Sequence, residues 1–232
     1  MAKRKTSSSA ADTTVDVQEV QAAAPPFCER YQYAILYVLG GIAVVVAAWY
    51  GYKTLIVEPQ QTEAEAAIWQ AQIQFDRDSF QLALENPGGG YDGFLGIIDK
   101  YGGTPAGNTA KYYAGICYLH TGDFDQAINY LEDFSPEGDL LPITRLGVLG
   151  DCYSEKKEFD KALDYYKKAA DAGNNELLSA YYLKKLGMLY EYQGKKEEAK
   201  EAYERLRRDF PNQSSADWRD IEKYIYRAGG GQ

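Results

Sequence analysis

Three stretches of the sequence repeat one another, and this self-similarity limits the possible folds more than any other feature. They begin at Ala114, Leu149 and Leu186, which lie 35 and 37 residues apart. Each holds a glycine, a tyrosine three residues later, an alanine nine residues after that, and a large apolar residue four further on. The four sets are Gly115, Gly150 and Gly187; Tyr118, Tyr153 and Tyr190; Ala127, Ala162 and Ala199; Leu131, Tyr166 and Tyr203. A period of this length indicates one supersecondary unit per repeat.

The pattern within each unit favours two antiparallel helices. The small glycine and alanine side chains let the two backbones approach closely, and the units stack because none can bury its own apolar face. The pattern resembles the tetratricopeptide repeat (TPR), whose units form a right-handed helical superhelix. We therefore predict an all-α fold with three repeat units over residues 108–213. Residues 214–228 indicate a capping helix with Ser214 and Asp217 at its start.

The segment 53–107 is expected to hold a long helix and a degenerate repeat. Residues 62–86 are rich in helix-forming alanine, glutamine and glutamate, so we predict a single helix there. Its candidate inward positions, by helical spacing, are Trp69, Ile73, Phe80 and Leu84. A short apolar helix is expected over residues 92–105, ahead of the first complete repeat.

Residues 88–93, with the sequence GGGYDG, match the G-x-G-x-x-G pattern of dinucleotide-binding loops. That chemistry needs the pattern after a strand and at the start of a helix, because the glycines let the helix N-terminus approach a pyrophosphate. Here a predicted helix comes first and nothing nearby indicates a strand. We interpret the stretch as a loop between two helices.

Residues 31–52 are the second strong feature, since these 22 residues include no charged side chain. A helix of that length reaches roughly 33 Å at about 1.5 Å per residue, which exceeds a hydrocarbon core of about 30 Å. Tyrosine and tryptophan lie at both ends, as expected at headgroup depth. We predict a retained transmembrane helix rather than a cleaved signal peptide, whose apolar core is shorter and nearer the start.

Basic residues are distributed unevenly around this span. A Lys-Arg-Lys run at residues 3–5 and Arg30 precede it, whereas only Lys53 follows closely. The positive-inside rule therefore places the N-terminus in the cytoplasm. Residues 1–30 are rich in serine, threonine and alanine, and we expect a disordered cytoplasmic tail.

The net charge indicates which partners are excluded. The four basic and four acidic residues before position 31 cancel, so the whole formal charge of −9 falls on the region after the span. An acidic domain does not neutralise phosphates, which argues against a nucleic-acid partner.

Candidate catalytic residues are few. A single histidine, His120, excludes a multi-histidine metal site. Cys117 lies three residues before it, but no orienting group or oxyanion site accompanies this pair. Cys117 and Cys152 occupy the same repeat position, so we interpret both as buried structural side chains. A disulfide between them is disfavoured, because stacked helices lie about 8–10 Å apart and a bridge spans at most ~7 Å. We expect no catalytic residue, cofactor or metal, and no enzyme.

The first helix of each predicted unit is expected to line the concave side of the superhelix and to bind protein. Counted in the repeat frame, the lining residues are Tyr112, Ile116 and Leu119 in unit one, Asp151 and Glu155 in unit two, and Tyr181, Lys184, Met188 and Tyr192 in unit three. An aromatic and aliphatic lining suits extended polypeptide. Packing of these side chains against a neighbouring unit is the alternative interpretation.

The layout of a short tail, one span with Gly40 and Gly41 near its middle, a long helix and repeats resembles the YfgM-like ancillary subunits of the bacterial Sec (SecYEG) translocon. The stretch TPAGNTAKYYAGICYLHTGDFDQAINYL resembles the first well-formed repeat of that family. The resemblance covers residue 30 to about residue 210. It implies an inner-membrane anchor and periplasmic repeats. The implied partners are translocon subunits, a membrane-bound prolyl isomerase chaperone and exported polypeptides.

Two other functions fit the same sequence. One is a TPR scaffold for a different envelope assembly complex, with the same fold and topology. The other is an organelle import receptor whose repeats face the cytosol, against which the basic residues 3–5 argue.

Overall fold

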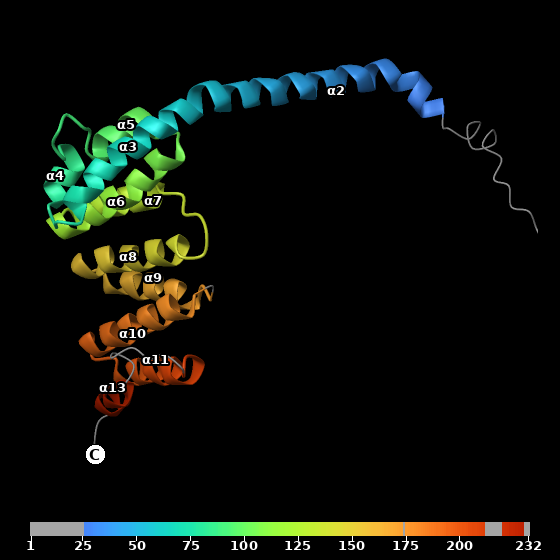
Figure 1. The fold of residues 1–232 in the computed structure, drawn as a ribbon. Helices are drawn as coiled ribbons and strands as arrows, with labels where there is room; N and C mark the ends of the chain where they lie inside the picture. The colour runs from blue at the N-terminus through green and yellow to red at the C-terminus, as the bar shows by residue number, and fades with distance from the viewer. Residues whose placement is uncertain (1–25, 174, 212–219, 230–232) are drawn as a thin grey trace, which may run out of the picture. The chain divides into compact units, whose positions relative to one another are not determined.

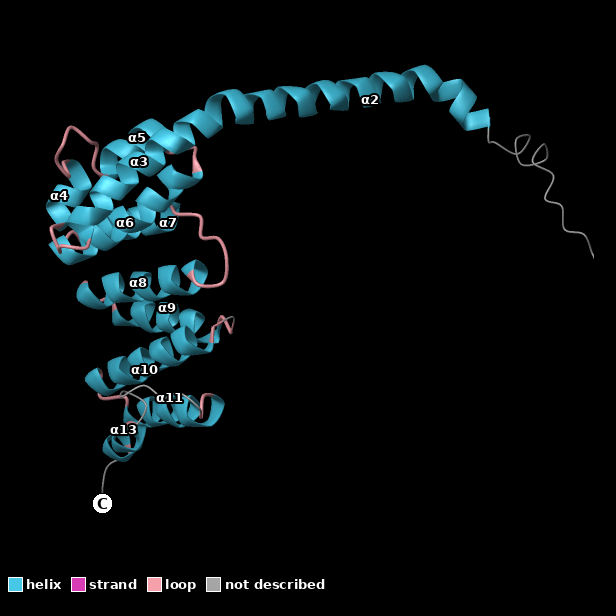
Figure 2. Cartoon of the chain, viewed as in Figure 1, coloured by secondary structure: helices cyan, strands magenta, loops and turns pink. Residues whose placement is uncertain are grey.

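The computed structural model describes residues 26–173, 175–211 and 220–229, and within these ranges every regular element is a helix (Figure 2). The predicted all-α class is confirmed for this part of the chain. Residues 1–25 of the predicted tail 1–30, and the expected start of the capping helix with Ser214 and Asp217, lie outside the described residues. Residues 26–30, also predicted as tail, are helical instead. The chain divides into two compact units, residues 1–54 and 55–232.

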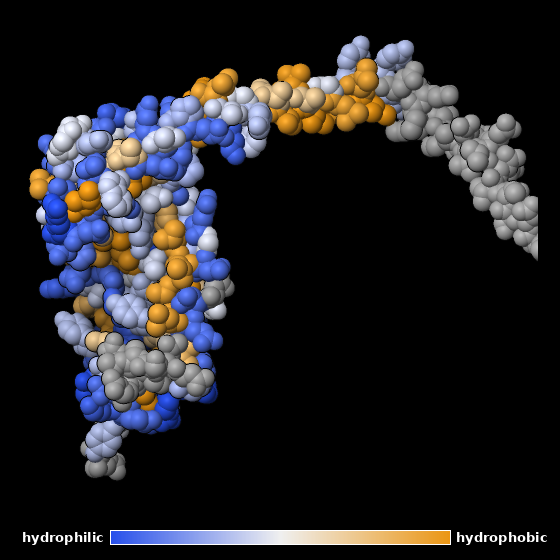
Figure 3. Space-filling view, in the orientation of Figure 1, coloured by the Kyte–Doolittle hydropathy of each residue, from blue (hydrophilic) through white to orange (hydrophobic). Residues whose placement is uncertain are grey.

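The first unit contains helix α2, Pro26–Tyr52, and the start of a π-helical turn, Lys53–Val57. The uncharged stretch 31–52 lies within α2, and its large side chains, such as Tyr37 and Val44, are exposed. Figure 3 shows apolar surface along this helix. Among the described residues, one helical stretch, Tyr33–Phe75, is long and apolar enough to cross a membrane. An apolar surface of this kind is stable in contact with lipid rather than water.

The second unit is a stack of helices in which each helix from α6 to α11 packs on the next (Figure 1). Its helices are α3 Glu58–Phe75, α4 Phe80–Glu85, α5 Phe94–Tyr101, α6 Pro105–Thr121, α7 Phe124–Asp133, α8 Leu141–Glu155, α9 Phe159–Asp171, α10 Glu176–Tyr192, α11 Lys196–Asp209 and α13 Ile221–Ala228. One core joins α3 to α6, and a second core runs from α7 to α13.

The single helix predicted over 62–86 is wrong, because the chain breaks between α3 and α4. The break falls at the polar run 76–79, where Asp78 takes a φ of +56°. Aspartate tolerates this left-handed conformation, which a helix cannot accommodate. Leu84 is buried as predicted, but Trp69 is 63% exposed. The buried face of α3 consists instead of Ala64, Ala67, Ile68 and Ala71.

The glycine-rich stretch 88–93 connects α4 to α5, so its interpretation as a helix–helix loop is confirmed. Gly88, Gly89 and Gly90 all have positive φ values, which glycine adopts without steric cost. The predicted short helix is α5, and it buries Phe94.

Close contact between the two helices of each repeat explains the repeated glycines. A Cβ atom added to Gly115 would lie 2.6 Å from the Leu131 side chain, and one added to Gly150 would lie 2.6 Å from the Tyr166 ring. The corresponding distance from Gly187 to the Tyr203 ring is 2.5 Å. In each unit the large residue at the last position of the repeat pattern therefore packs directly against the glycine of the same unit, as the spacing predicts.

The turn between the two helices of a repeat needs a left-handed residue at one position. Gly122 and Gly194 occupy it in units one and three, with φ values of +85° and +74°. In unit two the same position holds Lys157, with a φ of +63°. A lysine in this conformation carries a strain that glycine does not.

Side chains also bridge the link between α7 and α8. Arg145 of α8 donates its Nε–H to the Leu131 carbonyl at 2.7 Å and its Nη2–H to the Glu132 carbonyl at 3.1 Å. These carbonyls belong to the last turn of α7, where no intrahelical donor reaches them. Asn108 of α6 accepts from the Ser135 N–H and donates to the Ser135 carbonyl.

Helix α13 covers the end of the stack. It packs on α11 and buries Ile221. Arg227 of α13 forms an ion pair with Glu191 of α10, and Glu191 also accepts a hydrogen bond from the Tyr203 hydroxyl. The end of the predicted capping helix is therefore held to the third unit by charge as well as by apolar contact.

The glycine contacts lead to a prediction for stability. The Gly150→Ala variant should lower the free energy of unfolding by about 1–3 kcal/mol, because the new methyl group overlaps the Tyr166 ring. Urea denaturation followed by circular dichroism measures this change. Gly103→Ala is the matched control, since a Cβ there meets nothing within 4 Å. Equal effects of the two variants would contradict the close-packing account.

Candidate functional site

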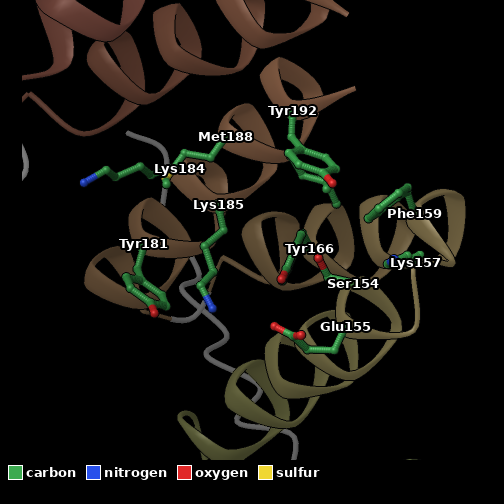
Figure 4. Close-up of a pocket in the computed structure, with 11 residues that line it drawn as sticks. Ser154, Glu155, Lys157, Phe159, Tyr166, Tyr181, Lys184, Lys185, Met188 and Tyr192 are labelled. Carbon is green, nitrogen blue, oxygen red and sulfur yellow. The ribbon is translucent and has the colours of Figure 1, made fainter. Parts of the chain in front are cut away.

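Four of the predicted binding residues meet along one face of α10. Tyr181 is 48% exposed, Met188 46% and Tyr192 73%, while Lys184 is half-buried. Together with Glu155 from the end of α8 they line an open hollow of about 630 Å³ (Figure 4). Large apolar side chains that remain exposed around a hollow are typical of surfaces that bind a partner.

Helix α9 and the turn before it supply walls that the sequence analysis missed. Phe159, the first residue of α9, contacts Tyr192 edge to face, with ring centroids 5.4 Å apart. Tyr166 and Lys157 also line the hollow. Phe159 has a sequence signal, because Phe124 occupies the same place at the start of α7. The predicted lining residues were taken only from the first helix of each unit, so Phe159 in the second helix was not included.

Lys185, also missed, anchors the polar side of the hollow. Its ammonium lies 2.6 Å from Asp151 Oδ1, and the same carboxylate oxygen accepts a hydrogen bond from the Tyr166 hydroxyl at 2.6 Å. The lysine also lies over the Tyr181 ring at 5.3 Å from its centroid. Burial and the adjacent Asp151 carboxylate raise the pKa of Tyr166 far above its usual range, so this hydroxyl stays protonated and donates.

A second hollow of about 540 Å³ adjoins the first. Its lining includes Leu119 from α6, the Asp151 carboxylate and the exposed His120. Ser154, Glu155, Tyr166 and Lys185 line both hollows. The two hollows therefore meet along this shared edge, and their combined lining draws on all three repeat units.

Two predicted binding residues lie elsewhere. Tyr112 is partly buried against Phe134, with ring centroids 5.2 Å apart, and burial raises the pKa of its hydroxyl. Ile116 is partly buried, and neither residue lines the two hollows. Phe134 belongs to the link between α7 and α8, which the repeat frame does not describe. Tyr112 thus packs against a neighbouring element, which was the alternative interpretation from the sequence.

The cysteines are buried, as interpreted from the sequence. Cys117 and Cys152 are both free thiols with no exposed surface. Burial raises the pKa of each thiol to about 12. His120 is exposed and stacks on Phe80, with ring centroids 4.3 Å apart. A thiol with this pKa stays protonated near neutral pH and is a weak nucleophile.

Acidic, histidine and thiol side chains are the groups that could hold a metal ion. Across residues 26–173, 175–211 and 220–229, no group of three or more histidine, cysteine, aspartate or glutamate side chains is placed to hold a metal ion. Asp151, which lines the second hollow, is instead paired with Lys185.

Comparisons with known proteins identify the repeats. Residues 109–135 match one tetratricopeptide-repeat family model, and residues 140–211 match a second one. No curated protein matches the chain. The matches cover α7, α8, α9, α10 and α11 in full and α6 from residue 109 onward. The chain therefore contains TPR repeats, which are protein-interaction scaffolds, and proteins built from them are typically non-catalytic.

The raised thiol pKa values lead to a prediction for reactivity. At pH 8, iodoacetamide should alkylate Cys117 and Cys152 about a thousandfold more slowly in the native full-length protein than in urea, because the folded thiols ionise only near pH 12. Mass spectrometry of quenched samples measures both rates. Fast alkylation of native Cys117 would contradict its structural role and reopen nucleophilic chemistry at this residue.

Proposed function

We propose that this protein is a non-catalytic, membrane-anchored TPR protein that binds polypeptide segments and assists protein export beside the Sec translocon. The observation that carries the proposal is the hollow lined by Tyr181, Met188 and Tyr192. These side chains are large, apolar and exposed, so they provide contact area that folding of the chain itself leaves unused.

The membrane anchor is residues 31–52, in contact with lipid. The Lys-Arg-Lys run at residues 3–5 and Arg30 favour a cytoplasmic N-terminus. Residues 53–107, the three repeats over 108–213 and the capping helix over 214–228 then lie on the periplasmic side of a bacterial inner membrane. Tethering there keeps a binding groove close to chains that emerge from the translocon.

The proposed partners are translocon subunits, a membrane-bound prolyl isomerase chaperone and exported polypeptides. The resemblance of residues 30 to about 210 to YfgM-like subunits supports this choice. A scaffold for another envelope assembly complex is the second candidate, since it has the same anchor and the same exposed hollow. A cytosol-facing import receptor requires the opposite topology. The acidic repeats are unsuited to nucleic acid.

Crosslinking in native membranes tests the function. A photoreactive amino acid placed at Tyr181 or Met188 should capture translocon subunits and exported chains, because both side chains face the hollow. Tyr226 of α13 is a matched control, since it is 68% exposed and does not line either hollow. Recovery of assembly-complex components alone favours the second candidate. Equal capture from position 226 contradicts binding at the hollow.

Thiol labelling tests the topology. In spheroplasts, a membrane-impermeant maleimide should label a Glu137→Cys variant, whose position is exposed in the link between α7 and α8. Cys28 should react only after the membrane is opened, because it precedes the span. The reverse pattern would place the repeats in the cytoplasm and contradict the export function.

A further inference from the structure

The exposed aliphatic side chains of the second unit gather where its helices begin. Among the described residues after the span, five leucine and isoleucine side chains are exposed. Leu55 and Ile56 lie just before α3, Leu140 lies just before α8, and Leu177 is the second residue of α10, whereas Leu82 lies in α4. Single exposed apolar side chains are normal on a protein surface, but a gathering of them marks an interaction site.

Hydrogen bonds hold the first of these helix starts together. Gln61, in the first turn of α3, accepts from the Ala106 N–H at the start of α6 at 2.9 Å. Asn108 of α6 makes two hydrogen bonds with Ser135, in the link that leads to α8. The starts of α3 and α6 and the link before α8 therefore lie at one edge of the unit.

The repeat frame extends this edge to α10. Leu140 and Leu177 are 37 residues apart, which is the offset between the second and third units, so both occupy the same repeat position. Figure 1 shows the α7–α8 and α9–α10 links on the same side of the stack as the start of α3. We refer to Leu55, Ile56, Leu140 and Leu177 together as the leucine edge.

The chain itself brings the leucine edge to the membrane. Leu55 follows Tyr52, the last residue of α2, by three residues. Three residues reach at most about 11 Å at ~3.6 Å each, so Leu55 stays near the end of the span. A tethered surface meets the lipid beside it at a higher effective concentration than it meets any soluble partner.

The charges of this edge indicate which surface it fits. Glu137, Asp139 and Glu176 are exposed beside the leucines. Two copies that met edge to edge would bring these carboxylates together, and like charges across a contact are unfavourable. Zwitterionic lipid headgroups carry no net charge, and aliphatic side chains can enter the boundary between headgroups and acyl chains.

We propose that the leucine edge rests on the surface of the membrane that the chain's own span enters, with Leu140 and Leu177 among the headgroups of zwitterionic lipids. The inference rests on the membrane anchor of the proposed function. It adds a second lipid contact, made by the repeats, and with it the orientation of the repeats on the membrane.

This contact sets the height of the binding surface. The two hollows share part of their lining, and we refer to them together as the groove. Tyr181 and Tyr192 of the groove follow Leu177 by four and fifteen residues along α10. At about 1.5 Å per residue these positions lie about 6 and 22 Å from the edge. The α10 end of the groove then opens beside the lipid surface, where a chain leaves the membrane.

The test measures lipid contact at single fluorescent labels on the full-length protein, with one chain in each phosphatidylcholine nanodisc. Bimane is attached to Leu140→Cys, Leu177→Cys or the control Leu82→Cys, each in a Cys28→Ser background. Leu82 is 51% exposed and Leu140 52%, but α4 follows the far end of α3. Nitroxide on the lipid headgroups should quench bimane at 140 and 177 about threefold more than at 82. Equal quenching at the three positions would overturn the proposal.

Serine variants test whether the leucines make the contact. Bimane at Glu137→Cys reports on the edge without replacing a leucine. Leu140→Ser with Leu177→Ser should lower its quenching about twofold, because two aliphatic side chains no longer enter the lipid. The control Leu82→Ser should leave it unchanged, and circular dichroism checks that both variants are folded. Unchanged quenching in the folded double variant would overturn the proposal.

Lipid charge separates an aliphatic contact from an electrostatic one. Replacing about half of the phosphatidylcholine by anionic phosphatidylglycerol should weaken the quenching at 140, because the carboxylates of Glu137, Asp139 and Glu176 are repelled, and salt should restore it. Stronger quenching with the anionic lipid would overturn the assignment to the leucines.

Other outcomes separate this inference from the proposed function. If crosslinking from Tyr181 captures translocon subunits but 140 and 177 are quenched no more than 82, the lipid contact is wrong while the export function stands. If quenching is as expected but crosslinking captures nothing, the lipid contact stands and the export function fails. If, in vesicles, bimane emission at 140 shifts to the blue with rising protein density and nitroxide lipid does not quench it, a second copy covers the edge and the inference is overturned.

Discussion

Close approach of two helix backbones at a glycine is the contact on which the repeat region depends. In each unit the first helix has no side chain at one position, and the second helix places a large apolar or aromatic residue there. Tyr166 lies against Gly150 and Tyr203 against Gly187, with no room for a methyl group between them. Because interiors are packed to high density, this fit sets the distance between the helices and therefore the pitch at which units stack.

The groove follows from this stacking. Tyr166 fills the space at Gly150 with its ring and still directs its hydroxyl to Asp151, which also holds Lys185 of the next unit. One side chain thus closes a repeat, joins it to its neighbour and forms part of the groove. Helix α10 has its buried face occupied by Tyr182, Leu183 and Leu186, so its opposite face, with Tyr181, Met188 and Tyr192, stays exposed.

Sequence periodicity predicted those parts of the structure that the repeat itself determines. The packing glycines, the turns at Gly122 and Gly194 and the buried cysteines all recur at fixed spacing, so their surroundings could be inferred. The α10 side of the groove was predicted for the same reason. Lys157 was not, since its left-handed conformation follows from the geometry of its neighbours and not from its own preference.

The remaining differences arise where the period gives no guidance. Helix propensity over 62–86 favours one helix, but the local turn at Asp78 divides it, and Trp69 is then exposed because small alanines pack the other face of α3. Tyr112 was expected on the binding surface, yet Phe134 from an irregular link covers it. Phe159 was missed because only the first helix of each unit was counted as lining. Lys185 was missed because its ion pair with Asp151 joins two successive units, and the spacing within one unit does not describe such contacts.

The link between the first two repeats has a consequence for how separable they are. The two matched family segments leave residues 136–139 between them, which suggests a natural place to divide the chain. Across this boundary, however, Arg145 of α8 donates hydrogen bonds to the Leu131 and Glu132 carbonyls at the end of α7. In a fragment that begins at residue 140, Arg145 loses the two carbonyls to which it donates. In a fragment that ends at residue 135, the Leu131 and Glu132 carbonyls lose the Arg145 donor. The apparent seam is thus crossed by two hydrogen bonds, which a cut between residues 135 and 140 breaks.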